Sequence, residues 1–338
     1  MSQPVAGRPA VVALAGGPAV VALGGGHGLA ASLAALRQLT DRLTAVVTVA
    51  DDGGSSGRLR REFGVLPPGD LRMALSALCD DSEWGRTWRD VLQHRFASAG
   101  ELHGHALGNL LIVTLWELLD DPIAGLDWVG RLLGARGRVL PMAAVPMDIE
   151  ASVLGIDPDD PAALTTVRGQ VSVASTPGRV VGVRLVPQQP PACAEAVQAV
   201  RSADWVVLGP GSWFTSVLPH LLVPELAAAL HETRARLCLT LNLGPQVGET
   251  EGFSPEAHLE VLAAHAPDLR VDAVLADPSS VENASSLADV AGLLGATLLI
   301  RSVCVAGSRT RHDPLLLAAA YQEVFSGGSG DARQQTGP

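Results

Sequence analysis

Lysine is absent from this sequence of 338 residues, and all 24 basic residues are arginines. The chain therefore has no P-loop lysine and no lysine that could form a Schiff base or act as a general base. Tyrosine is nearly absent as well, since Tyr321 is the single example. A short-chain dehydrogenase needs a tyrosine and a lysine together, so the lack of lysine excludes that class.

Cysteine and positive charge are also scarce. The formal net charge of −11 disfavours nucleic acid or an anionic membrane as the main partner, because both attract basic surfaces. The cysteines lie far apart with no C-x-x-C pair, which is typical of reduced thiols in a cytoplasmic protein rather than of disulfides or zinc ligands. They are Cys79, Cys193, Cys238 and Cys304. We expect a cytoplasmic protein, and a homodimer stays open.

Charged residues are missing between Arg8 and Arg37, which raises the question of a membrane span. Six glycines, two prolines and His27 interrupt this stretch and argue against one. Residues 1–17 are predicted to be a flexible N-terminal tail, and residues 327–338 a disordered C-terminal tail.

The order of apolar runs predicts an α/β fold with a Rossmann-like parallel sheet flanked by helices. Strands are expected at 19–23, 43–49, 204–208, 237–243, 271–276 and 298–306, and helices at 29–39, from about 212 through 230, and at 255–265. The segments QVSVAS and RVVGVRLV alternate, which predicts a small β-rich insert at about 139–190. We expect one domain over residues 18–326.

A glycine-rich turn follows the first predicted strand. Its glycines allow a tight turn and a close approach of backbone to a pyrophosphate, whose oxygens would meet the N–H groups of the following helix. His27 is as readily a turn residue as a ligand contact. The turn consists of Gly24, Gly25, Gly26, His27 and Gly28.

A second polar loop follows the second predicted strand, where dinucleotide-binding folds place an acidic residue against ribose hydroxyls. Two aspartates followed by hydroxyls and an arginine suit ribose or sugar recognition beside a phosphate, and the aspartates could also hold a divalent metal. The alternative is an ordinary solvated turn. The candidate residues are Asp51, Asp52, Ser55, Ser56 and Arg58.

Two further motifs contain polar residues next to predicted helices. In PPGDLR, Asp70 is explained by helix capping, and Arg72 could hold a phosphate. In HGHALGN, His105 and Asn109 would share one face of a helix that starts near His105. A metal at the H-x-H pair is disfavoured, because no further ligand lies at a suitable spacing.

A second glycine loop lies at another strand-to-helix turn and, like the first, combines small residues with exposed amides and hydroxyls at a helix N-terminus. Two such loops on one sheet would form a cleft for a phosphate-bearing ligand. Residues beyond the next strand, Asn242 and the loop that contains Thr250, are expected to close this cleft. The glycine loop and the hydroxyl that follows it are Gly209, Pro210, Gly211, Ser212 and Thr215.

Six segments in this order together resemble the YvcK-type gluconeogenesis factor branch of the CofD-like family. They are VALGGGHGL, TVADDGGSSGRLR, PPGDLR, HALGNLL, VLGPGSWFTSVLPHLLVPEL and GETEGF, and the resemblance as a whole runs from about residue 19 to 277. The resemblance implies a Rossmann-like domain with an inserted subdomain and a pocket for a nucleotide or UDP-sugar. It also implies a role in adapting cell-envelope synthesis and cell shape to gluconeogenic carbon sources.

Three departures from the family pattern concern the ligand more than the fold. His27 stands where threonine is usual, Met73 stands where asparagine is usual, and the segment LNLGPQV at 241–247 follows the pattern loosely. The loss of asparagine at position 73 removes a polar group from the expected cleft.

The leading hypothesis is a regulatory protein that binds a UDP-sugar and signals through an unidentified protein partner. The second is a CofD-like transferase that acts with Mg²⁺ on a nucleoside-diphosphate-activated substrate, in which Asp51, Asp52 or Asp70 holds the metal or the acceptor. In the first hypothesis no catalytic residue is assigned. An NAD-dependent dehydrogenase is a third class, and bound NAD could mimic the true nucleotide.

Overall fold

The main sheet has seven strands, all parallel, in the order β10-β9-β8-β7-β1-β2-β3. The computed structural model describes residues 17–246 and 249–327, so the predicted tails, apart from Gly17 and Gly327, lie outside the described residues. The strands are β1 (Val20–Gly24), β2 (Leu43–Val47), β3 (Arg138–Pro141), β7 (Trp205–Leu208), β8 (Arg236–Thr240), β9 (Ala273–Ala276) and β10 (Thr297–Ile300). The predicted α/β fold with a Rossmann-like parallel sheet is confirmed.

The chain changes direction across the sheet between β1 and β7. From β1 it builds outward to β2 and β3, and then returns to place β7 on the other side of β1. Parallel sheets of this kind bind ligands at the carboxyl ends of the strands, at the point where the strand order reverses. The loops that follow β1 and β7 are therefore the first place to look for a site.

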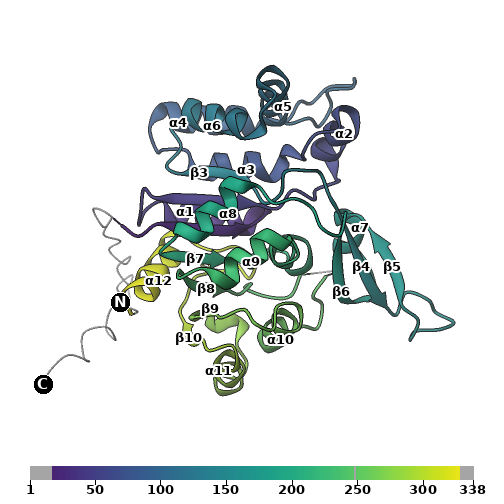
Figure 1. Cartoon of the computed structure of the whole chain (residues 1–338), viewed down its shortest axis with the longest axis vertical. Coiled ribbons are helices and arrows are strands. Elements are labelled where there is room, and N and C mark those ends of the chain that lie inside the picture. Colours follow the sequence, from purple (N-terminus) through teal and green to yellow (C-terminus); the bar gives the residue numbers. More distant parts are fainter. Residues whose placement is uncertain (1–16, 247–248, 328–338) are drawn as a thin grey trace, which may run out of the picture.

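Helices cover the sheet and gather at its two ends (Figure 1). Helix α1 (Gly26–Leu36) packs against α3 (Pro68–Leu78) and α12 (Pro314–Gly327), while α8 (Ala194–Ser202) packs against α9 (Pro224–Glu232). A helical end beside β3 contains α2 (Gly54–Phe63), α4 (Glu83–Gln93), α5 (Leu107–Leu119) and α6 (Pro122–Leu133). Helices α10 (Pro255–His265) and α11 (Ala284–Leu293) lie at the β9–β10 end.

A small antiparallel sheet projects from the molecule at the lower right of Figure 1. Its strands are β4 (Asp148–Leu154), β5 (Thr165–Arg168) and β6 (Arg179–Val186), in the order β5-β4-β6. This sheet agrees with the predicted β-rich insert, although β3 at the start of the predicted range 139–190 pairs with β2 in the main sheet. The limits of the insert as a domain remain a prediction.

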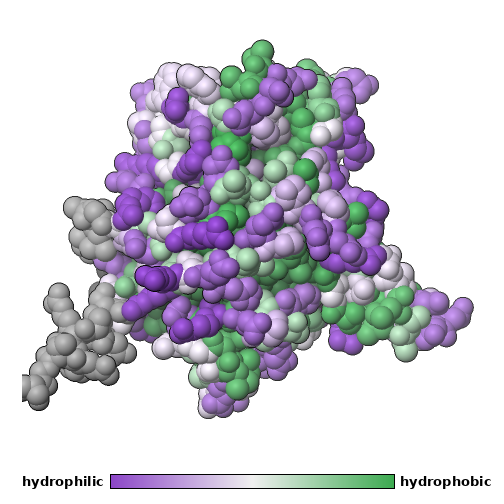
Figure 2. Space-filling model, viewed as in Figure 1, coloured by the Kyte–Doolittle hydropathy of each residue, from purple (hydrophilic) through white to green (hydrophobic). Residues whose placement is uncertain are grey.

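Ion pairs join this small sheet to α2. Asp148 accepts from Arg60 of α2 at 2.6 Å and from Arg168 of β5 at 2.7 Å, and Glu150 pairs with Arg168 and Arg184. Each carboxylate is therefore shared by two guanidinium groups, which fixes the side chains of all three strands relative to one another. Figure 2 shows apolar surface on this projecting sheet and on the helical end, where Val181 and Leu118 are exposed.

Two predicted elements differ in the structure. The segment QVSVAS was expected to be a strand, but Gln170–Ala174 forms the short helix α7, because the Asp52 carboxylate accepts from the Val171 N–H at 3.0 Å and Gly169 turns the chain at φ +98°. The single helix expected from about 212 through 230 is broken into a π-turn at Trp213–Val217, a 3₁₀ turn at Leu218–Leu221, and α9. Pro219 and Pro224 lack the N–H groups that a continuous helix needs.

Other differences concern where elements begin and end. Helix α1 starts at Gly26, three residues earlier than predicted, so the glycine-rich turn is also the first turn of the helix. Strand β10 ends at Ile300, well before the predicted end at 306. Helix α10 has the predicted bounds.

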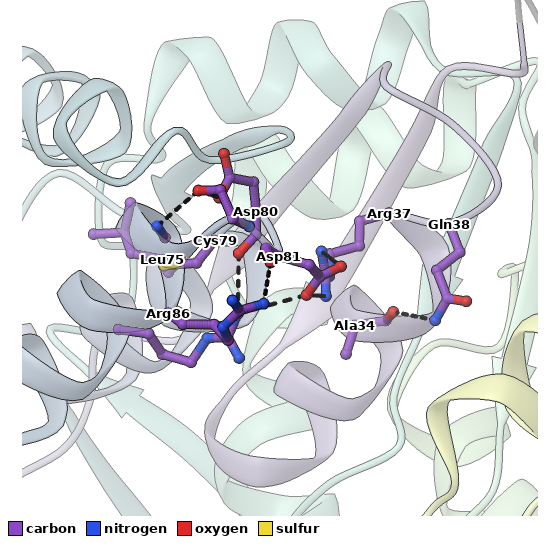
Figure 3. A network of polar contacts seen from close by, with 11 residues as sticks. Ala34, Arg37, Gln38, Leu75, Cys79, Asp80, Asp81 and Arg86 are labelled. Atoms are coloured by element: carbon purple, nitrogen blue, oxygen red, sulfur yellow. Dashed lines mark hydrogen bonds and ion pairs between the residues drawn. The ribbon is translucent and has the colours of Figure 1, made fainter.

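A polar network at the C-terminal end of α1 joins this helix to the turn between α3 and α4 (Figure 3). Arg37 donates to both oxygens of Asp81 at 2.8 and 3.1 Å, and Arg86 donates to the Asp81 carbonyl oxygen. The planar guanidinium makes this a two-point contact, which fixes the turn more firmly than a single ion pair.

Within the described residues, no single helix is both long and apolar enough to cross a membrane. One bent pair, Trp213–Leu221 with Pro224–Glu232 at 72°, meets the requirement by length and composition.

Tyr321 of α12 connects three elements in the core. Its buried hydroxyl lies 2.8 Å from Ser32 Oγ of α1 and 3.0 Å from Thr240 Oγ1 of β8. Ser32 in turn donates to the carbonyl oxygen of Gly209 at 3.2 Å. We expect Tyr321→Phe to lower the free energy of unfolding by about 1–3 kcal/mol, because two buried hydroxyls lose a partner.

Denaturant unfolding monitored by circular dichroism measures this loss. Ser326→Ala near the exposed end of the same helix is the matched control, and it should change stability by less than about 0.5 kcal/mol. Equal stability of Tyr321→Phe and the unmodified protein would contradict the assigned role of the hydroxyl.

Candidate functional site

The two glycine loops touch each other through their backbones at the carboxyl edge of the sheet. A Cβ on Gly28 would lie 2.2 Å from the carbonyl oxygen of Pro210 and 2.7 Å from Gly211 Cα, so only glycine fits at position 28. Gly209 and Gly211 have φ values of +76° and +150°, which favour glycine as well. The structure thus brings the two predicted loops together, as the sequence pattern required.

The N-terminus of α1 already has a carboxylate beside it. A Cβ on Gly25 would lie 2.7 Å from Asp70 Oδ2, and the Gly26 N–H donates to the same carboxyl group. The prediction that Asp70 caps its own helix is wrong: α3 begins after Pro67 without a side-chain cap, and Asp70 lies in its first turn. The Asp70 side chain instead accepts a hydrogen bond from the backbone amide of Gly26 at the start of α1.

Asp51 and Asp70 form a pair of half-buried carboxyl groups. Burial, together with the nearby charge of Asp51, raises the pKa of Asp70 to about 7. Burial also raises the pKa of Asp51, although hydrogen bonds from Gly53 and Ser56 oppose the shift. Ser56 accepts from the Gly69 N–H at 2.8 Å, so the loop after β2 is held against the start of α3.

Asp52 has a different role from Asp51. Its carboxylate accepts from Val171 of the insert at 3.0 Å. A Cβ on Gly169 would lie 2.3 Å from Asp52 Oδ2, so the contact is tight. Within the described residues, no group of three or more His, Cys, Asp and Glu side chains is arranged to hold a metal ion.

Four predicted site residues form a buried polar network behind the loop that follows β2. Ser55 Oγ lies 3.0 Å from His105 Nδ1 and accepts from Asn109 Nδ2 at 3.0 Å. Asn109 Oδ1 accepts from Arg72 Nε at 2.8 Å. His105 precedes α5 rather than starting it, because the helix begins at Leu107. All four side chains are buried, so they position the loop rather than line an open surface.

The two remaining polar residues predicted near α1 and α2, Arg58 and His27, lie outside this buried network. Arg58 donates to the carbonyl oxygens of Glu101 and His103, at 3.2 and 2.7 Å, and so holds the loop before α5. His27 is exposed on the first turn of α1. Whether either contacts a ligand stays a prediction.

The second glycine loop is held by the residues that follow β8. Asn242 makes two hydrogen bonds with Gly211, accepting from its N–H at 2.9 Å and donating to its carbonyl oxygen at 2.8 Å. Glu249 accepts from the Ser212 hydroxyl and from the N–H of Thr215. Thr250 Oγ1 accepts from the Gln246 N–H at 2.9 Å and therefore shapes its own loop. Gly248 lies outside the described residues.

A cavity of about 790 Å³ lies beyond Asn242, between the loops that follow β8 and β9. The N-caps of α10 and α11, Ser254 and Asn283, line it together with Arg309. Sequence reasoning did not include these three residues. The helix N-caps carry a sequence signal, Ser before Pro-Glu and Asn before Ala-Ser, whereas Arg309 carries none.

The fold and this edge define a Rossmann-like protein with two glycine loops at the point where strand order reverses. The family sequence model described as "2-phospho-L-lactate transferase CofD" matches residues 20–291. The chain belongs to the CofD family.

Relatives in other bacteria support this assignment. A Mycobacterium leprae protein named "Putative gluconeogenesis factor" is 54% identical over 304 residues, covering 89% of this chain and 84% of the relative. A Halalkalibacterium halodurans protein named "Gluconeogenesis factor" is 39% identical over 248 residues, covering 73% of this chain and 74% of the relative. A crystal structure from Bacillus halodurans, described as a member of the upf0052 family, has a TM-score of 0.79 at 31% identity, covering 91% and 99% of the two chains.

The raised pKa of Asp70 predicts a pH-dependent effect of Asp70→Asn. The carboxyl group ionises near pH 3.8 when unfolded and near pH 7 when folded. Its contribution to stability is therefore complete below about pH 4 and is lost as the pH rises through 7. Asparagine keeps an acceptor for the Gly26 N–H and has no charge, so the variant gains stability relative to the unmodified protein between pH 4 and pH 8, on the order of 2–4 kcal/mol.

Denaturant unfolding at pH 4, 6 and 8 measures this difference. Asp268→Asn, at an exposed position after α10, is the control that should show little change with pH. A constant difference between Asp70→Asn and the unmodified protein across this range would contradict the assigned burial of the charge.

Ser55→Ala tests the buried network. The substitution removes the hydroxyl that Asn109 and the Ala106 N–H use as an acceptor, at 3.0 and 3.3 Å. We expect a loss of about 2–3 kcal/mol in the free energy of unfolding. Ser152→Ala, on the exposed face of β4, should be close to neutral, and an equally small effect at Ser55 would argue against the network.

Proposed function

We propose that this protein binds a nucleoside-diphosphate sugar, with UDP-sugars as the leading candidates, at the carboxyl edge of the main sheet. In this proposal it is a regulatory protein that links carbon metabolism to cell-envelope synthesis and cell shape. The observation that carries the proposal is a continuous row of polar groups along this edge, leading from the Asp51–Asp70 pair to the 790 Å³ cavity.

The row runs through groups already in contact. Asp70 lies against Gly25, and a Cβ added to Gly25 would lie 3.1 Å from Ser216 Oγ. Gly211, in the same loop as Ser216, bonds to Asn242. Asn242 itself lines the cavity. A ligand with a diphosphate between a base and a sugar is long enough to use several of these groups at once, and a cavity of this size suits a small molecule.

A regulatory role is favoured over catalysis by what the edge contains. Its acidic groups are hydrogen-bonded to backbone amides. His105, which contacts Ser55 behind the loop that follows β2, is buried, and burial lowers its pKa. Two serines of this edge do contact a base, Ser55 with His105 and Ser212 with Glu249, but both bases are buried, so the edge favours polar contacts for binding over an exposed nucleophile. The relatives named for gluconeogenesis are consistent with a role in carbon metabolism.

A transferase is the second candidate, and one observation favours it. Asp51 and Asp70 lie close enough for the charge of one to raise the pKa of the other, and both are half-buried. Mg²⁺ commonly binds one or two carboxylates and completes its shell with substrate phosphates and water. The residues fit such an ion, which would neutralise a diphosphate leaving group. The family description, a 2-phospho-L-lactate transferase, makes this the natural alternative.

The setting of this function is also part of the proposal. We place the protein in the cytoplasm, on the basis of its reduced, widely spaced cysteines. A regulatory ligand signal needs a reader, so we propose a protein partner that recognises the liganded form, and a homodimer remains compatible with this scheme. NAD is included among the ligands to test because the first strand, helix and strand are of the dinucleotide-binding type.

The test is a thermal-shift panel of the full chain with UDP-N-acetylglucosamine, UDP-glucose, GDP and NAD, each with and without Mg²⁺. A ligand at about 100 times its Kd adds roughly 2.7 kcal/mol to the folded state. We expect a selective shift with a UDP-sugar that needs no metal. A shift that requires Mg²⁺ and GDP would support the transferase instead, and no shift with any UDP-sugar at millimolar concentration would reject the proposal.

Asn242→Ala serves as the site variant, because it removes both hydrogen bonds to Gly211 and a polar wall of the cavity. The UDP-sugar affinity should fall at least 10-fold. Gln198→Ala, an exposed amide on α8, is the control and should leave the affinity unchanged.

A further inference from the structure

Glu249 fills the donors of the second glycine loop. Its Oε1 accepts from the N–H of Phe214 at 2.8 Å and from the N–H of Thr215 at 3.1 Å, while the Ser212 hydroxyl lies 2.6 Å from both of its oxygens. Ser212 and Thr215 are among the residues that the sequence predicted to contact a ligand phosphate. Each of them already has an acidic partner from within the chain.

The Glu249 carboxylate is also sealed from solvent. The residue is 5% exposed, and in the part of the chain that the structure describes it makes no ion pair with an arginine. Burial raises its pKa, and the hydrogen bonds from Ser212, Phe214 and Thr215 counter that shift. Among the described residues, the groups that favour its ionised form are therefore the amide and hydroxyl donors of the second loop.

The Asp51–Asp70 pair at the α1 end of the edge differs from Glu249 in its exposure to solvent and in its distance from an arginine. Asp51 and Asp70 each keep part of their surface exposed, and the guanidinium of Arg72 lies near enough to act on both charges. Phosphate oxygens can therefore approach this end once a cation or a proton is present. At the second loop they would instead meet the buried Glu249 carboxyl group, which already accepts hydrogen bonds from the donors of that loop.

We propose that Glu249 determines the orientation of the bound nucleotide: its carboxylate keeps the phosphates away from the second glycine loop and directs them to the α1 end. The uncharged part of the ligand then lies over the second loop, towards the cavity beyond Asn242. The inference rests on the proposed function, since it concerns the same edge and the same class of ligand. It assigns to Glu249 a specificity role that the glycine pattern by itself does not contain.

Glu249→Gln tests the proposal with UDP and uridine as probes. Glutamine keeps the acceptor for the two backbone N–H groups and removes the charge. UDP should bind about 5- to 10-fold more tightly to Glu249→Gln, whereas uridine affinity should change less than 2-fold, both measured by titration calorimetry on the full chain. Glu251→Gln, two residues along the same loop and exposed, removes one charge as well and should leave both affinities unchanged.

Unchanged or weaker UDP binding to folded Glu249→Gln would overturn the proposal, as would an equal gain for UDP and uridine. Glu249→Ala is the second variant, used if Glu249→Gln does not fold. It also removes the charge, so it should tighten UDP binding about 5- to 10-fold and change uridine affinity less than 2-fold. Equal affinity of this variant and the unmodified protein for UDP would then overturn the proposal.

Inorganic pyrophosphate separates this inference from the proposed function. If the unmodified protein binds neither UDP-sugars nor UDP, the proposed function fails. Pyrophosphate then reports on the loop alone: tighter binding to Glu249→Gln than to the unmodified protein and to Glu251→Gln supports exclusion by the carboxylate. Identical pyrophosphate binding by all three proteins rejects it.

Discussion

The backbone contact between the loops that follow β1 and β7 is the constraint on which the rest of the edge depends. Gly28 lies so close to Pro210 that a single added carbon would meet the carbonyl oxygen at 2.2 Å. This contact closes the point where strand order reverses and fixes the start of α1 beside the second loop. Ser32, Tyr321 and Thr240 extend the same junction into the core through hydroxyl contacts, which is why the site and the core share one set of anchors.

Both helix starts that face the edge are held by carboxylates of the chain itself. Asp70 serves α1, and Glu249 serves the turn after the second glycine loop. Free amides at a helix start carry partial positive charge, and an acidic side chain can satisfy them as a phosphate can. The two carboxylates differ in their access to solvent and to cations, so the edge is electrostatically asymmetric although its glycine motifs look alike.

The parallel sheet, its strand runs and the meeting of two glycine loops were predictable from sequence, because apolar runs and glycine turns act locally. The hydrogen-bond partner of each acidic side chain was not predictable. Asp70 has the sequence position of a helix cap and Asp52 that of a ribose contact, yet Asp70 bonds to Gly26 and Asp52 to Val171. The short helix α7 was missed for the same reason, since its start depends on a carboxylate more than a hundred residues away. Glu249 and the cavity beyond Asn242 likewise arise only from tertiary packing.

The adjacency of Asp51 and Asp52 has a thermodynamic consequence. One carboxylate faces the candidate ligand edge and the other holds α7 of the projecting sheet, so a single peptide unit joins the two. If a ligand at Asp51 shifts this peptide, the free energy of docking the small sheet changes with it. Linkage is reciprocal, so a molecule that grips the small sheet must alter ligand affinity by the same factor.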